Sequence, residues 1–364
     1  MSRHTGTTHR SYNLALFAVI MPVVVVLAST SFFLQPYDGG LTRLGGYPEK
    51  LYGWTGSQLR FSKSLYRQYM GREAEYREPA DIVVIGDSFT FMQHISWPNF
   101  LVQQTGLRLQ SFRIDKTPIE NLLNSDGFRA HPPRILIYET VEREIRNRLG
   151  GEQHDCAVQP LARTQSPQPV TPLSVDPEPY GRDTAAALLD FSLSIDFLAK
   201  VVPREYLGHD RTPVARLALS RPAPFSNFER RQLLVYKDDL AKSGWTPETW
   251  ERARCNLVGL QNRVQANGRT FFVAMIAPDK LTAYSAFLAE SRYRTLSRID
   301  LLARDPALHL PRLDLRLRGA VDDGIVDVYL NNDTHWVSAG YRIVAQELVD
   351  FLTRRAVIAP APRP

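Results

Sequence analysis

Two short motifs bring together the residue types that perform acyl transfer. The first is Gly86-Asp87-Ser88-Phe89, and the second, near the other end of the chain, is Asp333-Thr334-His335-Trp336. A serine hydroxyl is a weak nucleophile at its free pKa, and an imidazole that a carboxylate orients makes it reactive. The motifs therefore predict a Ser-His-Asp site with Ser88 as the nucleophile, His335 as the base and Asp333 as the carboxylate.

The sequence before Ser88 places the serine at the end of a strand. The apolar run 81–85 is typical of a buried strand, and a helix is predicted over 88–105. Ligands bind at the carboxyl ends of strands in open α/β sheets, and a helix N-terminus offers free N–H groups to an oxyanion. We expect Gly86 and Asp87 to lie beside this oxyanion site. The alternative is that Asp87 and Ser88 only cap the helix.

The second motif supplies the base and the carboxylate. Two residues apart, Asp333 and His335 cannot share a helical face, but on a loop both can converge on Ser88. His335 would take the serine proton and later return one, while Asp333 would hold the imidazole tautomer. Alone, the motif is typical of a turn with an exposed histidine, and its pairing with Ser88 favours catalysis. Trp336 is expected to pack and orient the loop.

Strands and helices alternate on either side of these motifs. This alternation predicts an α/β fold over 79–355, with a mostly parallel sheet covered by helices on both faces. The final helix is expected to begin at Ser338. The other predicted strands cover 107–114, 134–140 and 271–276, and the other long helices are predicted over 246–266 and 284–302.

Three further segments interrupt or flank this pattern. Residues 38–78 read as a glycine-rich tether followed by a partly helical segment. A proline-rich insertion at about 150–230 is predicted to be mostly a long surface loop, a lid or a partner-binding segment, with a helix over 184–202. Residues 356–364 are predicted to be a disordered tail by composition.

The N-terminus predicts an exported protein. Residues 1–10 are basic, and the uncharged stretch 11–37 is long enough to cross a membrane. Positive charge before this stretch predicts an inner-membrane, single-pass anchor with its N-terminus in the cytoplasm and the catalytic domain periplasmic. A signal peptide cleaved near Ala28-Ser29-Thr30 is the alternative, and it exports the domain as well.

Composition and the lack of other motifs argue against several further ligand classes. A net charge of +6 without a basic stripe argues against nucleic acid. The chain lacks phosphate-loop, HExxH and dinucleotide motifs, and its histidines lack ligand spacing, so no cofactor and no metal are expected. Cys156 and Cys255 either form one disulfide or stay unpaired.

These residues resemble a known family. The serine block followed by the Asp/His block has the order of SGNH-type hydrolases. The Asp333–Trp336 tetrad, with the stretch Ala277-Pro278-Asp279-Lys280 and Tyr284, is similar to the SGNH-like domain of alginate O-acetyltransferases. The likeness covers roughly 80–145 and 245–352. It implies a three-layer fold, O-acetylation of an exopolysaccharide, and a multi-pass membrane acyltransferase as the partner that delivers the acyl group.

The chain also departs from that family. In the alginate enzymes the tetrad precedes the serine block, and here it follows. The second-block glycine and third-block Gly-x-Asn-Asp are replaced by 111–116 and 138–143, so the Ser88 N–H is the only predicted oxyanion donor. Lys280 would bind a carboxylated sugar or lie in solvent. Arg143 would line the site or form a structural salt bridge. An esterase with the same triad, or an inactive scaffold of a polysaccharide export complex, remain alternatives to the transferase.

Overall fold

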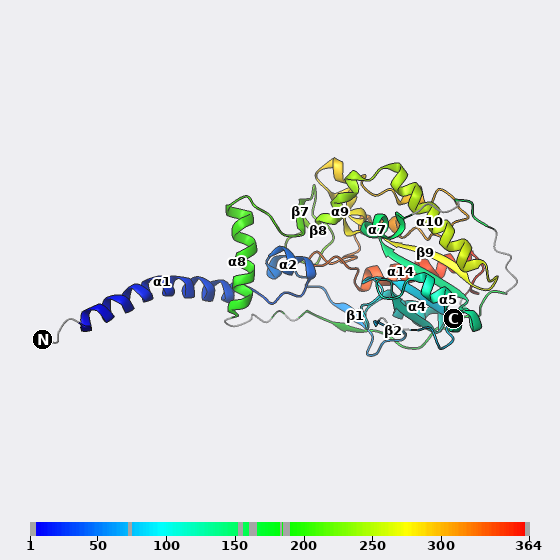
Figure 1. The fold of residues 1–364 in the computed structure, drawn as a ribbon, viewed down its shortest axis with the longest axis horizontal. Helices are drawn as coiled ribbons and strands as arrows, with labels where there is room; N and C mark the ends of the chain where they lie inside the picture. Colours follow the sequence, from blue (N-terminus) through cyan, green and yellow to red (C-terminus); the bar gives the residue numbers. More distant parts are fainter. Residues whose placement is uncertain are drawn as a thin grey trace.

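The computed structural model describes residues 5–71, 75–151, 156–159, 166–182, 184 and 190–360. Figure 1 shows a long helix, α1 (Thr5–Phe33), projecting from a body built around a central sheet. Within α1, Arg10–Phe33 is apolar and long enough to cross a membrane, and only 6% of its apolar window is buried inside the protein. The helix therefore presents its apolar side chains outward.

The central sheet has five parallel strands in the order β2-β4-β3-β5-β9. Every residue of β3, β5 and β9 is buried, as expected of a sheet covered on both faces. The strands are β2 (Arg67–Tyr69), β3 (Ile82–Gly86), β4 (Leu109–Arg113), β5 (Ile135–Val141) and β9 (Phe271–Ala277). The mixed α/β fold with a mostly parallel sheet is as predicted.

Helices cover both faces of this sheet. Alternate strand residues enter two apolar clusters, with Val84 and Ile137 in one and Val83 and Leu136 in the other. The first face is covered by α4 (Trp97–Thr105), α13 (Leu313–Asp322) and α14 (Ser338–Arg354). The second is covered by α5 (Ile119–Asn124), α6 (Asp126–Ala130), α7 (Ile145–Leu149), α10 (Pro247–Gln265) and α12 (Ile299–Leu302).

The helix predicted to begin at Ser88 begins instead at Trp97. Pro98 explains the difference, because a proline inside a helix lacks an N–H and its ring clashes with the carbonyl four residues earlier. A helix running on from Ser88 would place Pro98 in its interior, whereas the observed helix has it in the first turn. The C-terminal end agrees with the prediction, with Gly106 in the left-handed conformation.

The predicted tether 38–78 is part of the folded body. It contains α2 (Gly40–Gly45), α3 (Glu49–Tyr52), β1 (Gln58–Arg60) and the sheet strand β2. Leu41 and Tyr52 are buried against Val214 and Leu234. The prediction of a tether is therefore wrong for this segment, because its scattered apolar residues find partners only in a hairpin far along the chain.

The insertion at 150–230 is also more regular than predicted. Its β6 (Glu178–Tyr180) pairs with β1, and β7 (Val214–Ala218) pairs with β8 (Gln232–Tyr236). The helix predicted over 184–202 is observed as α8 (Phe191–Tyr206), while 183 and 185–189 lie outside the described residues. The remaining helical turns are η1 (Glu142–Glu144), α9 (Lys237–Leu240), η2 (Ala241–Gly244), α11 (Lys280–Ala283), η3 (Ser285–Phe287) and η4 (Ser291–Tyr293).

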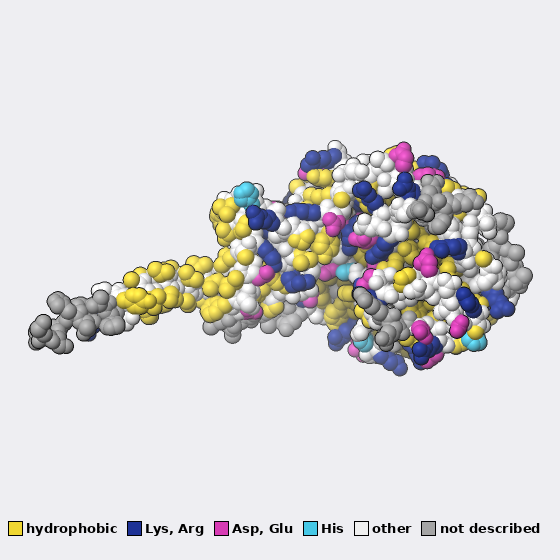
Figure 2. All heavy atoms as spheres, viewed as in Figure 1, with side chains coloured by type: hydrophobic (Ala, Val, Ile, Leu, Met, Phe, Trp, Pro, Cys, Tyr) yellow, Lys and Arg dark blue, Asp and Glu magenta, His cyan; other side chains and the backbone are white. Residues whose placement is uncertain are grey.

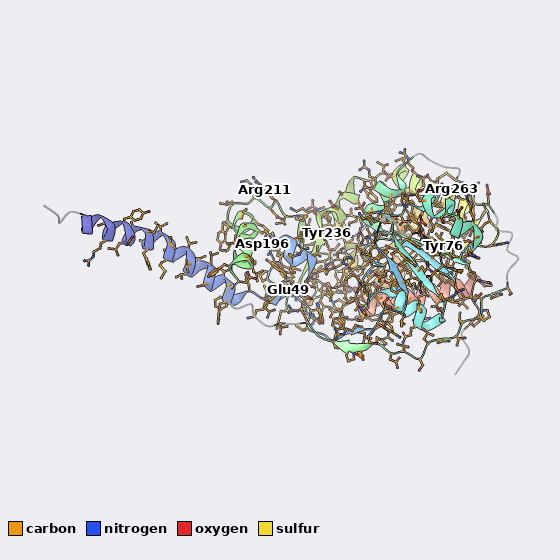
Figure 3. The ribbon with its side chains drawn as sticks, turned by 60° about the horizontal axis from the view of Figure 1, so that its bottom comes forward. Glu49, Tyr76, Asp196, Arg211, Tyr236 and Arg263 are labelled. Carbon is orange, nitrogen blue, oxygen red and sulfur yellow. A yellow bond between two sulfur atoms is a disulfide. The ribbon has the colours of Figure 1, made fainter. Side chains whose placement is uncertain are left out.

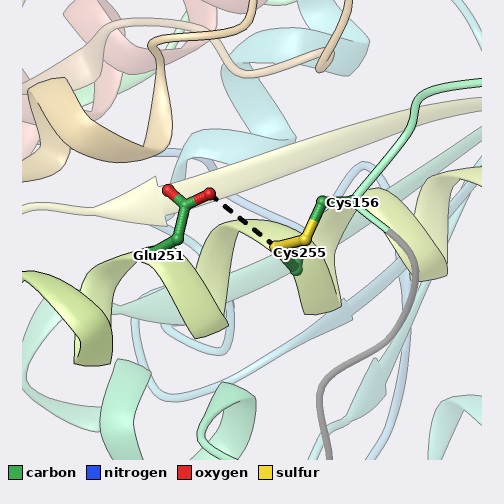
Figure 4. Close-up of side chains that lie close together, drawn as sticks. All are labelled: Cys156, Glu251 and Cys255. Carbon is green, nitrogen blue, oxygen red and sulfur yellow. Dashed lines mark hydrogen bonds between the residues drawn. A yellow bond between two sulfur atoms is a disulfide. The ribbon is translucent and has the colours of Figure 1, made fainter.

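One disulfide and one β-bridge attach the insertion to other parts of the protein. Cys156 and Cys255 form a disulfide that joins the insertion to α10 (Figure 4). Ile358 pairs with Gln168, and Val357 and Ile358 are buried. The predicted disordered tail is therefore wrong at these positions, because two adjacent apolar residues find a buried site, and 361–364 lie outside the described residues.

Candidate active site

The side chains of Ser88, His335 and Asp333 are joined by two consecutive hydrogen bonds. The Ser88 Oγ is 2.8 Å from the His335 Nε2, and the His335 Nδ1 is 2.6 Å from the Asp333 Oδ1. The two motifs thus converge as the sequence predicts. Ser88 and His335 are partly exposed, so a substrate can reach the hydroxyl and the imidazole from solvent.

Asp333 is held as a carboxylate by several donors. Its Oδ1 also accepts the His335 backbone N–H at 2.9 Å, and its Oδ2 accepts the Gly40 N–H at 2.8 Å. Burial opposes the charged form, but His335 and these N–H groups hold the Asp333 pKa well below its usual range. A charged Asp333 requires the proton on the His335 Nδ1, which leaves the Nε2 free to accept the Ser88 proton.

Residues 40–49 form hydrogen bonds with the loop that carries Asp333. The Asn332 carbonyl accepts the N–H groups of Leu41 and Thr42, at 2.9 and 3.3 Å. The Asn332 side chain donates to the Glu49 Oε1 at 2.6 Å. The sequence does not predict this contribution. The donors are backbone N–H groups of the six-residue helix α2, and no particular residue type marks them.

Ser88 lies where the sheet order reverses. It follows β3, whose neighbours β4 and β5 come later in the chain and lie on opposite sides. The carboxyl ends of two such strands are the usual ligand site of open α/β sheets, because the loops that follow them diverge. His335 reaches this end of the sheet from the loop before α14, where Trp336 is fully buried between Phe89, Tyr329 and Tyr341.

Gly86 and Asp87 shape the turn that carries Ser88. A Cβ on Gly86 would lie 2.4 Å from the Thr90 Oγ1 and 2.7 Å from the Glu139 Oε2, so only glycine fits. The Asp87 side chain accepts the N–H groups of Phe89 and Val141 and pairs with Arg148 at 2.7 Å. The expectation that these residues line the oxyanion site is therefore replaced by a structural role.

Glu139 shares this buried turn with Asp87. Its Oε2 accepts the Asp87 N–H at 2.7 Å and the Thr90 hydroxyl at 3.0 Å. Burial and the charge of Asp87 raise the Glu139 pKa far above its usual range. Burial also disfavours a charged Asp87, but Arg148 and the N–H donors lower its pKa. The two buried acids that support the serine turn therefore have pKa values shifted in opposite directions.

The Ser88 N–H is the one oxyanion donor that the sequence predicts. Among the described residues, none accepts a hydrogen bond from the Ser88 N–H, which is thus available to a developing oxyanion. The helix N-terminus expected at this position is not there, since α4 begins only at Trp97. Phe89 supports the base, with its ring centroid 4.9 Å from that of His335.

Lys280 is neither a solvent-exposed lysine nor a sugar ligand. Its buried Nζ donates to the carbonyls of Leu330, Asn331 and Asp333, at 2.9, 3.0 and 2.7 Å. Burial lowers the Lys280 pKa to about 7, against the charges of Asp333 and Asp239. Both predicted roles are wrong, because all three ammonium hydrogens hold the backbone on which Asp333 sits.

Arg143 forms a structural salt bridge, which is one of the two roles that the sequence predicts for it. Its Nη1 is 2.9 Å from the Asp279 Oδ1 and 3.5 Å from the Asp239 Oδ1, and it donates to the Thr334 Oγ1 at 3.4 Å. Lys242, whose side chain is fully buried, lies 2.6 Å from Asp279 and 3.1 Å from Glu142. This charged cluster joins the end of β5 to the Asp333–Trp336 loop. Lys242 and Asp239 gave no sequence signal, since lone charged residues are usually exposed.

The arrangement can activate one hydroxyl and pass its proton through one imidazole. The only group of possible metal ligands among the described residues is Cys156, Cys255 and Glu251, and its two sulfurs are bonded to each other (Figure 4). A site of this kind performs nucleophilic acyl chemistry. Comparison of the chain with protein-family models, curated proteins and solved structures finds no match.

Proposed function

We propose that the protein is a membrane-anchored, extracytoplasmic O-acyltransferase that acetylates a polysaccharide. The observation that carries the proposal is the Ser88–His335–Asp333 hydrogen-bond sequence, with contacts of 2.8 and 2.6 Å. The strand-to-turn position of Ser88 and the order of the two blocks support an SGNH-like fold. An assembled triad with a charged carboxylate favours an enzyme over an inactive scaffold.

The reaction would proceed in two half-reactions. The Ser88 Oγ attacks the acyl carbonyl while the His335 Nε2 takes its proton, and the bond to the donor breaks as the imidazolium protonates the leaving group. A sugar hydroxyl then attacks the acyl-serine and gives its proton to His335. The new ester leaves as the imidazolium returns a proton to the Ser88 Oγ.

The location is part of the proposal. The apolar α1 would anchor the chain with its N-terminus in the cytoplasm. The Cys156–Cys255 disulfide supports an oxidising compartment such as the periplasm. A multi-pass membrane acyltransferase would supply the acyl group, as the family resemblance implies.

The test uses the full chain in lipid nanodiscs, with an aryl acetate as donor and mixed oligosaccharides as acceptors. Mass spectrometry should find an acetyl increment on the sugar that falls at least about a thousand-fold in Ser88→Ala. Ser291→Ala, at an exposed serine of η4, is the matched control and should keep full activity. Serine-dependent donor turnover with unmodified sugars would assign an esterase, and equal transfer by Ser88→Ala would refute the nucleophile.

A further inference from the structure

Helix α8 presents an apolar stripe to the outside of the protein. Ile195 is 55% exposed and Tyr206 79%, and Phe191 and Val202 are exposed as well. At about 3.6 residues per turn, positions 191, 195, 199, 202 and 206 fall on one side of the helix. All five are apolar or aromatic, with Ala199 in the centre. Exposed stripes of this kind mark a surface that another apolar phase covers.

Three of the four charged residues of α8, Asp196, Lys200 and Arg204, lie on the other side of the helix, while Glu205 is exposed and pairs with Arg204. The Lys200 Nζ donates to the Arg43 carbonyl at 2.7 Å and pairs with Asp196 at 2.6 Å. Arg204 donates to the Gly46 carbonyl at 3.1 Å and lies over the Tyr47 ring. A helix on a water-exposed surface has the opposite polarity, with charges outward. The inverted polarity of α8 therefore indicates that water is not its outer neighbour.

Helix α8 lies against the part of α1 nearest the body. The Ser194 hydroxyl donates to the Leu27 carbonyl at 3.1 Å. In Figure 1 the two helices cross, with α1 leaving the body on the far side of α8. Figure 2 shows hydrophobic side chains along α1 and at the end of the body from which it projects. In Figure 3, Asp196 is labelled on α8, and Arg211 lies in the loop beyond the end of α8 that is farther from α1.

We propose that α8 lies flat in the lipid–water interface, with its 191–206 stripe among the acyl chains on the side where the domain emerges. The inference rests on the proposed membrane anchoring by α1. Leu27 lies six positions before Phe33, the end of α1, which is about 9 Å along a helix. Interfacial helices enter the boundary by about 5–10 Å, so the contact places α8 at the depth of such a helix.

A bilayer fits this surface better than a protein partner. The stripe has aromatic residues, Phe191 and Tyr206, near its two ends, and aromatic side chains favour the headgroup level. Exposed Arg43 and Arg211 lie beside α8 and suit anionic headgroups. The anchor already brings a bilayer to this side, whereas a second occupant would have to displace it.

The experiment places one environment-sensitive fluorophore in the full chain. Because both native cysteines are in the disulfide, an introduced cysteine is the one free thiol. The variants are Ile195→Cys in the stripe, Val24→Cys on α1 and Leu315→Cys on α13, a matched control that is 50% exposed. Each is reconstituted into vesicles of phosphatidylcholine and phosphatidylglycerol that carry a nitroxide near the headgroup or near the chain end.

The expected result is that the headgroup-proximal nitroxide quenches the Ile195 label more than about twofold over the Leu315 label. The Val24 label should be quenched from within the bilayer. Quenching at Val24 with Ile195 no more quenched than Leu315 would overturn the proposal for α8 while leaving the anchor intact. A blue-shifted Ile195 label without nitroxide quenching would overturn it in favour of a protein occupant. Loss of quenching at Val24 would refute the anchor and the inference with it, and none of these readouts depends on acyl transfer.

Discussion

Lys280 acts on the site through backbone carbonyls and does not reach Ser88 or His335. It gives all its donors to residues 330–333, so the position of the Asp333 carboxylate depends on one buried ammonium group. Buried carbonyls left without a donor cost about 1–3 kcal/mol each. Lys280 is therefore a positioning residue in the proposed enzyme.

Lys280→Met should lower kcat/KM about a hundred-fold and also lower the denaturation midpoint. The reason is that a displacement of about 1 Å at Asp333 misaligns the imidazole. Kinetics with the aryl acetate and urea unfolding measure the two effects. Lys237→Met, at a partly exposed lysine, is the control and should change stability by less than about 0.5 kcal/mol. An unchanged kcat/KM in a destabilised Lys280→Met would contradict the positioning role.

The buried cluster around Arg143 contains more carboxyl groups than cations. Arg143 and Lys242 face Asp239, Asp279 and Glu142. Burial, followed by the charge of Asp279, raises the Asp239 pKa to about 8, while Arg143, Lys242 and Lys280 oppose the shift. Asp239 therefore keeps its proton to a higher pH in the folded protein than in the unfolded chain.

This raised pKa predicts the sign of a pH dependence. Folding raises the Asp239 pKa from 3.8 to about 8, so its stability contribution is complete below pH 3.8 and is lost as the pH rises through 8. The slope is at most about 1.4 kcal/mol per pH unit. Asp239→Asn should match the wild type near pH 4 and become relatively more stable up to pH 8. Urea midpoints across this range measure it, with exposed Asp238→Asn as the control. A constant difference at every pH would exclude the titration.

At the residue scale, the sequence was sufficient to predict the three side chains that converge at the candidate site. Ser88, Asp333 and His335 stand in short motifs whose residue types specify their chemistry. The sequence could not predict Lys280 or the Gly40 N–H, because their function depends on where distant backbone carbonyls and carboxylates lie. Residue type predicts an exposed lysine, and burial with complete hydrogen bonding is the exception.

Among the elements, α2 has the most direct effect on the site. It begins at Gly40, whose N–H binds Asp333, and Gly39 lies against Asn332. A Cβ on Gly39 would lie 2.1 Å from the Asn332 carbonyl oxygen. Close backbone approach of this kind is a use of glycine that no other residue can replace.

Gly39→Ala should therefore push the 332–333 loop away from α2. We expect a loss of about 1–3 kcal/mol in stability and at least a tenfold loss in kcat/KM. Gly71→Ala is the matched control, since a Cβ at that position meets nothing within 4 Å. Kinetics and thermal unfolding measure both. If the two variants behave alike, α2 does not position the carboxylate.

The buried strands and α10 were predictable, whereas the helix predicted over 284–302 is wrong, since this segment holds only η3, η4 and the short α12. The apolar strands β3, β4, β5 and β9 match their predicted segments closely, and α10 begins behind Thr246 as its cap signals indicate. The three-residue β2 has no hydrophobic alternation, so its place at the sheet edge depends on pairing with β4. The start of α4 was predictable in principle from Pro98.

At the scale of the whole molecule, one disulfide fastens the start of the insertion to the body around the central sheet. It closes a sequence separation of 99 residues. In the chain-entropy account, cross-linking a loop of this length stabilises the fold by up to about 4–5 kcal/mol. Cys156 and Cys255 lie on the insertion and on α10, apart from the triad.

The paired variant Cys156→Ser/Cys255→Ser should unfold at a lower temperature than the wild type. Reductant should lower the wild-type midpoint towards that of the variant and leave the variant unchanged. Acyl transfer measured below both midpoints should be nearly equal, because the bond acts on stability alone. A wild-type midpoint that does not respond to reductant would show that the bond does not form.

The bond between Gly40 and Asp333 also fixes how far the active site can lie from α1. The chain runs from Phe33, the end of α1, to Gly40 in seven steps, which an extended backbone covers in at most about 25 Å. In the proposed orientation, Ser88 stays within a short, fixed reach of the bilayer and would meet its polymer close to the membrane. Such an enzyme would stay in place while the polymer moves past it. The spacing of acyl groups along the product would then be set by the ratio of export speed to turnover.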